Sequence, residues 1–75
     1  MGYRFYDITV ERKDEDKANS IISHHMDIGN LHDCYVCRES GSNGRRLVRY
    51  RVSPYISEDL EIIKNDFKKN GIELF

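Results

Sequence analysis

The sequence predicts an α+β fold in which two helices cover one face of an antiparallel four-stranded sheet. Three observations predict it: apolar residues alternate along three segments, they recur at helical spacing along two others, and 75 residues can enclose only one thin core. The segments follow one another as strand, helix, strand, strand, helix and a short final strand. We therefore expect a single two-layer domain over residues 1–75.

The first strand and the first helix are predicted between residues 3 and 29. Alternation in "YRFYDITVER" indicates a strand whose inward side chains are Tyr6, Ile8 and Val10. Its outward side chains are then Tyr3, Phe5, Asp7 and Thr9. The acidic run "KDEDK" suits the start of a helix, and Gly29 suits its end. The apolar stripe of this helix comprises Ala18, Ile21, Ile22, His25 and Met26.

The second and third strands are predicted to form a hairpin. In "LHDCYVCRES" (residues 31–40) the alternation is ambiguous, because Leu31, Tyr35 and Cys37 lie on one face while His32, Cys34 and Val36 lie on the other. The turn "SGSNG" follows, in which glycine and asparagine tolerate positive φ. Residues 45–53 form the third strand, which Pro54 ends because proline has no N–H to donate.

The second helix is predicted to begin at Ser57, a residue favoured at the N-cap position. Leu60, Ile63 and Phe67 then give a buried face at i, i+3 and i+7. The pair "NG" closes the helix, and residues 72–75 predict a short fourth strand. The complete order favours a ferredoxin-like βαββαβ sandwich, with both helices on one face and the first and third strands at the centre.

In that arrangement one face of the sheet has no helix on it, and its side chains are the candidate partner-binding residues. They combine apolar and guanidinium groups: Tyr3, Phe5, Leu47, Arg49 and Arg51. An apolar patch exposed to water usually marks an interface. We therefore expect a small non-enzymatic protein-binding or regulatory module, which binds a protein partner or forms a homodimer through this face.

Two other interpretations of the same face are open. The alternative partner is single-stranded RNA or DNA, whose bases stack on aromatic rings while guanidinium groups contact phosphates. The surface is loosely similar to that of the RNA-recognition motif, although "RLVRYRV" lacks the glycine of that family's third strand. The other interpretation is structural, since Asp7 and Glu11 would lie beside Arg49 and Arg51 on the neighbouring strand and pair with them.

Net charge and hydropathy restrict the kinds of partner that the chain is expected to bind. Lys plus Arg number 12 against 13 for Asp plus Glu, so the net charge of −1 gives no general attraction to nucleic acid or to an anionic membrane. No apolar run approaches the roughly 20 residues that span a bilayer, and "MGYRFYDITV" does not have the pattern of a signal peptide. The expectation is a cytoplasmic protein that does not contact membranes.

The sequence predicts neither a metal site nor another cofactor. Five soft ligands occur within "HHMDIGNLHDCYVC": His24, His25, His32, Cys34 and Cys37. Residues three apart in a strand point to opposite faces, so the two thiols do not easily reach one metal ion. The chain also contains no nucleophile elbow, phosphate loop or H-E-x-x-H motif, and we therefore expect no enzymatic activity.

Overall fold

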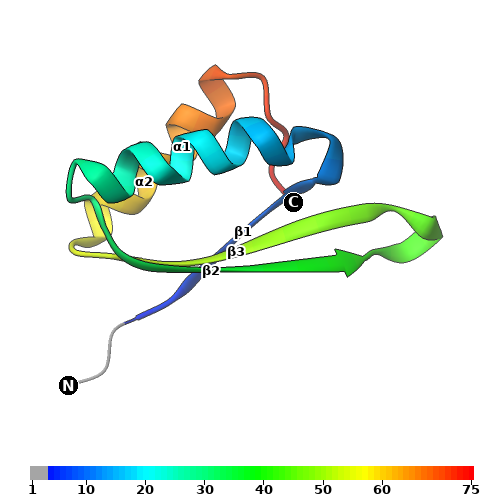
Figure 1. The fold of residues 1–75 in the computed structure, drawn as a ribbon, viewed down its shortest axis with the longest axis horizontal. Helices are drawn as coiled ribbons and strands as arrows, with labels where there is room; N and C mark the ends of the chain where they lie inside the picture. Colours follow the sequence, from blue (N-terminus) through cyan, green and yellow to red (C-terminus); the bar gives the residue numbers. More distant parts are fainter. Residues whose placement is uncertain (1–3) are drawn as a thin grey trace.

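The computed structural model describes residues 4–75, which form three strands and two long helices (Figure 1). In chain order these are β1 (Tyr6–Glu11), α1 (Glu15–Asp27), β2 (Leu31–Ser40), β3 (Arg46–Pro54) and α2 (Ser57–Lys69). A 3-10 turn at Arg12–Asp14 leads into α1, and another at Ser42–Gly44 joins β2 to β3. Asn43 and Gly44 both have positive φ in this second turn, 64° and 71°, which explains the choice of these two residue types.

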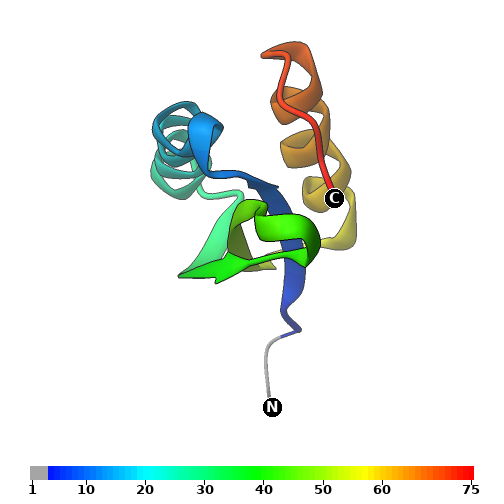
Figure 2. The ribbon, with the colours of Figure 1, turned by 90° about the vertical axis from the view of Figure 1, so that its right-hand side faces the viewer.

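The sheet is antiparallel throughout, with the strand order β1-β3-β2. Both helices lie on one face of it, and the opposite face carries no helix (Figure 2). The hairpin formed by β2 and β3 extends beyond the helices, as the green ribbon in Figure 1 shows. Side chains near the end of this hairpin therefore reach solvent from both faces of the sheet.

The core lies between β3 and the two helices. On the sheet side it contains Ile8 and Val10 of β1 with Val48, Tyr50 and Val52 of β3, all at most 2% exposed. The inward positions predicted for the first strand are thus confirmed, with Tyr6 half-buried at the margin. On the helix side α2 buries Leu60, Ile63 and Phe67, as its helical spacing predicts, and α1 buries Ala18, Ile22 and His25.

The predicted fourth strand is wrong, and with it the four-stranded ferredoxin-like sheet. After α2 the chain turns at Gly71, where φ is +74°, and the Ile72 N–H donates to the Phe67 carbonyl to close the helix. The Ile72 side chain is buried in the core, so it belongs to the cap of α2. The three residues that follow make one backbone bond to β1, from Phe75 N–H to the Thr9 carbonyl at 2.9 Å. Such a segment is too short for a ladder, and β1 is therefore an edge strand instead of a central one.

A β-bulge at the start of β2 resolves the ambiguity in its alternation. The register with β3 shifts between Leu31 and Asp33. Leu31 consequently enters the core. In a regular strand Tyr35 and Cys37 would lie on the same face as Leu31. Tyr35 pairs with Arg51 and lies on the face without helices.

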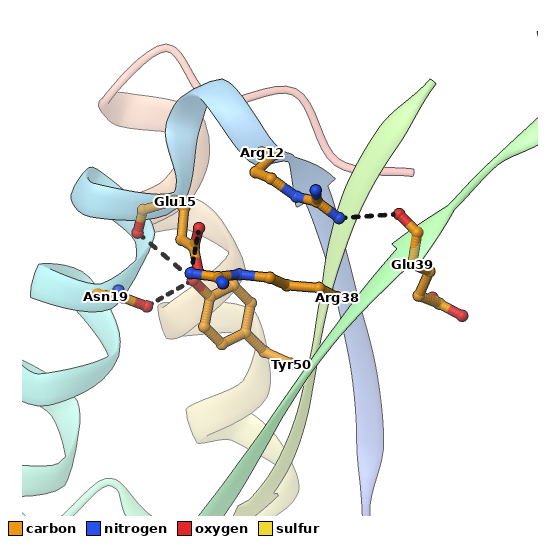
Figure 3. Close-up of polar contacts among 6 residues, drawn as sticks. All are labelled: Arg12, Glu15, Asn19, Arg38, Glu39 and Tyr50. Atoms are coloured by element: carbon orange, nitrogen blue, oxygen red, sulfur yellow. Dashed lines mark hydrogen bonds and ion pairs between the residues drawn. The ribbon is translucent and has the colours of Figure 1, made fainter. Parts of the chain in front are cut away.

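Tyr50 connects the sheet to α1 (Figure 3). Its ring is fully buried and packs edge-on against Phe67 of α2, with ring centroids 6.4 Å apart. The hydroxyl group donates to Oδ1 of Asn19 at 2.6 Å. Beside it, Arg38 of β2 makes a two-nitrogen contact with the Glu15 carboxylate at 3.1–3.3 Å. Sheet and first helix are therefore joined by two polar contacts at the same level.

A buried histidine joins the two helices to each other. His25 of α1 is 2% exposed, and its Nε2 lies 2.6 Å from Oδ2 of Asp66 on α2. The side-chain amide nitrogen of Asn30 lies 2.9 Å from Nδ1 of the same ring, within hydrogen-bond distance. Both ring nitrogens are therefore occupied, and His25 has a structural role.

We predict that Tyr50→Phe lowers the free energy of unfolding by about 1 kcal/mol, because it removes the bond to Asn19 and leaves the ring packing intact. Urea denaturation followed by circular dichroism measures the change. Tyr55→Phe is the matched control, since Tyr55 is 61% exposed and the same substitution there should change stability by less than about 0.5 kcal/mol. Equal stabilities of wild type and Tyr50→Phe would contradict the structural role of this hydroxyl.

The raised pKa of Tyr50 predicts that the folded protein loses stability at alkaline pH. Burial, followed by the charge of Glu15, raises the pKa of Tyr50 from 10.0 to about 12. A raised pKa in the folded state means that the stabilisation is complete below pH 10.0 and is lost as the pH rises through about 12. Denaturation across this pH window should show a steeper loss of stability in the wild type than in Tyr50→Phe. Parallel pH profiles for the two proteins would refute the assignment.

Candidate interaction surface on the open sheet face

The sheet face without helices, here called the open face, carries four of the five predicted partner-binding residues. Phe5, Leu47 and Arg49 are half-buried there, and Arg51 is exposed. Tyr3, the fifth, lies outside the described residues. The register places Arg51 opposite Asp7 of β1, and Arg49 opposite Cys37 of β2. The alternation of β3 thus puts Arg49 and Arg51 on the open face and Val48 and Val52 in the core.

A band of paired charges crosses the open face at its middle. Arg51 lies 3.3 Å from the carboxylate of Asp7, and Arg49 lies 3.9 Å from the same group. Arg49 also approaches the carboxylate of Glu39 on β2 at 3.4 Å. The predicted pairing with Asp7 is therefore confirmed, whereas Glu11 lies opposite Leu47 and Glu39 takes the other position beside Arg49. Two guanidinium and two carboxylate groups leave this band with no net charge.

An aromatic pair lies at one end of the band. The rings of Phe5 and Tyr35 approach to 5.5 Å between centroids, in a tilted arrangement that aromatic pairs favour. Tyr35 is 58% exposed, so one ring of the pair is available to a partner. Hydrogen bonding to Asp33, and the charge of that carboxylate, raise the pKa of Tyr35 above its ordinary value. The phenol is therefore a neutral group at neutral pH.

Tyr35 is the residue of this surface that the sequence analysis did not single out. The signal was present, because the alternation along residues 31–40 places Tyr35 on the same face as Cys37 and leaves open which face is buried. Only the pairing with β3 decides between the two alternations.

Leu47 lies at the other end of the open face, away from the aromatic pair. The aromatic pair lies near Val52 and Ser53, at the end of β3 where Val52 pairs with Tyr6. Leu47 is six residues before Ser53 along β3, which corresponds to about 20 Å of strand. Leu47 packs instead on the hairpin turn, where a Cβ added to Gly41 would lie 2.9 Å from its Cδ1. The apolar residues of the open face thus form two separate groups with the charged band between them.

The two cysteines lie on opposite faces of β2, as the strand geometry predicted. Cys34 faces the helices and is half-buried, whereas Cys37 is exposed on the open face beside Arg49. Burial, with a smaller contribution from Asp33, raises the pKa of Cys34 from 9.0 to about 11. Within residues 4–75 no group of histidine, cysteine and carboxylate side chains is arranged to hold a metal ion.

Comparison of the chain with protein-family models, curated proteins and solved structures gives no match. Neither helix in the described part of the chain has the length and apolar character that crossing a bilayer requires.

We predict that the two thiols differ strongly in reactivity. At mildly alkaline pH the raised pKa leaves Cys34 with roughly a hundredfold less thiolate than an ordinary cysteine, so iodoacetamide should modify Cys37 first. Mass spectrometry over a time course measures both rates, and Cys37→Ser isolates the slow site. In denaturant the two rates should converge. Equal rates in the folded protein would show that β2 does not shield Cys34.

Proposed function

We propose that this chain is a small non-enzymatic protein-binding module that associates with a second copy of itself through the open face. The observation that carries the proposal is the Phe5–Tyr35 pair, in which Tyr35 is exposed, on a sheet face that no helix covers. Aromatic side chains supply most of the binding energy in many protein interfaces, because they bury a large area at little cost in conformational entropy.

The charges of the open face support a protein partner. Arg49 and Arg51 already contact Asp7 and Glu39, so they are less available to phosphate groups than free arginines. Single-stranded nucleic acid on this same face, the alternative partner, therefore has weaker support. A neutral band of paired charges suits an interface, where charged groups contribute orientation more than affinity.

A second copy of the chain complements this face in charge. The band contains both signs, with Asp7 on one edge strand, Glu39 on the other and the two arginines on the central strand. When two such faces meet about a twofold axis, an arginine of one copy can approach a carboxylate of the other without a net repulsion. The aromatic pairs would then be buried, while the arginines fix the orientation of the two sheets.

The test is the oligomeric state of a charge-introducing variant. We predict that the wild-type protein dimerises with rising concentration, and that Tyr35→Glu raises the dissociation constant by at least about tenfold. The substitution places a carboxylate at an exposed ring, so the fold should persist. Sedimentation equilibrium across the micromolar range measures both constants.

Tyr55→Glu is the matched control, because Tyr55 is equally exposed but lies on the connection between β3 and α2. Its dissociation constant should equal that of the wild type. A wild-type protein that remains monomeric at high micromolar concentration would overturn the proposal, and so would equal effects of the two substitutions.

A further inference from the structure

A second charged surface lies at the end of the sheet nearest the hairpin, apart from the open-face band. Two basic dipeptides meet there, Arg12–Lys13 after β1 and Arg45–Arg46 at the start of β3. The ladder between β1 and β3 ends at the pair Glu11 and Leu47, so the next residue of each strand is an arginine. The four cations come together beyond the end of this ladder, around one common hollow.

These four cations line one hollow of about 420 Å³, in which Glu11 is the single acidic lining residue. The ion pairs within residues 4–75 engage His25, Arg38, Arg49 and Arg51, and none of the four cations of the hollow. Arg12 is fixed in place by donating to the Glu39 carbonyl at 3.3 Å (Figure 3). Like charges that line one hollow repel one another, and an anion bound between them would relieve that repulsion.

A neighbouring hollow extends the same surface toward an aromatic ring. It shares Arg45 with the first hollow and adds Phe75 together with the turn residues Ser42 and Asn43. The Arg45 guanidinium lies 5.0 Å from the centroid of the Phe75 ring, which is 47% exposed. The Phe75 backbone is anchored to β1 through its bond to Thr9. Arg45 thus lies over one face of a partly exposed aromatic ring.

We propose that this basic cluster, Arg12, Lys13, Arg45 and Arg46, is a binding site for the phosphate backbone of single-stranded nucleic acid. Three of its four cations are arginines, whose planar guanidinium groups match phosphate oxygens in pairs. The ring of Phe75 can stack against a base that an unpaired strand exposes, which a duplex does not offer. An acidic peptide would satisfy the charges alone and would leave the ring without a specific role.

The basic cluster is separate from the aromatic pair proposed for self-association, although Leu47 of the open face lines the neighbouring hollow. It uses neither the aromatic pair nor Arg49 and Arg51, although Glu39, whose carboxylate pairs with Arg49, also accepts the bond from Arg12 through its backbone carbonyl. The net charge of the whole chain is −1, so attraction to a polyanion has to be local. Loss of one activity with retention of the other would show which proposal has failed.

The experiment measures fluorescence anisotropy of a labelled oligothymidylate of about eight nucleotides, within the range that small single-strand-binding surfaces cover. With three or four phosphates neutralised, the logarithm of the affinity should fall against the logarithm of salt concentration with a slope of about −2 to −3. The double variant Arg45→Gln, Arg46→Gln should weaken binding at least about tenfold and reduce the slope by about half. Phe75→Leu should weaken binding about fivefold with an unchanged slope, because it removes the π-face and no charge.

The charge-matched control is Lys68→Gln with Lys69→Gln, which removes two exposed cations from the end of α2 and should leave binding unchanged. The proposal is overturned if the wild type does not bind the oligonucleotide at low salt, or if the control weakens binding as much as the Arg45 and Arg46 variant. It is also overturned if binding depends on Arg49 and Arg51 instead. A polyglutamate peptide that binds as tightly as the oligonucleotide would reassign the cluster to an acidic protein partner.

Discussion

The fold depends on the burial of Tyr50 at the centre of the middle strand. Its ring fills the space between the sheet and both helices, in contact with Phe67, and its hydroxyl is satisfied by Asn19 on α1. A buried phenol without that acceptor would be costly, so the side chain determines where α1 lies against the sheet. The ion pair between Arg38 of β2 and Glu15 of α1 is a second contact between the sheet and α1. His25 of α1 and Asp66 of α2 join the two helices to each other.

The placement of the core on one face of the sheet has direct consequences for the other. Side chains alternate along β3, so Val48, Tyr50 and Val52 point into the core while Leu47, Arg49 and Arg51 point to the open face. The arginines at the middle of β3 meet carboxylates on both neighbouring strands, whereas those at its start meet other cations. One strand therefore carries two electrostatically different surfaces: a neutral band with an aromatic pair, and a cationic end beside an aromatic ring.

The limits of prediction from the sequence follow from particular residues. The inward positions of β1 and the buried face of α2 were readable because periodicity reports burial directly. The side of β2 that carries Tyr35 was not readable, because the bulge after Leu31 breaks the alternation. The final segment was misassigned because Ile72 has the apolar character of a strand residue but closes α2, and nothing in four residues distinguishes these roles.

The sequence by itself determined the elements of this protein: three alternating strands, two amphipathic helices, and the faces that β1, β3 and α2 turn toward the core. Only the tertiary structure decided which charges are neighbours. All four arginines lie within seven residues, yet Arg49 and Arg51 lie against Asp7 and Glu39, whereas Arg45 and Arg46 line a hollow with Arg12 and Lys13. The physical reason is that pairing across a sheet depends on register and strand order, which arise from long-range contacts and leave no local pattern in the chain.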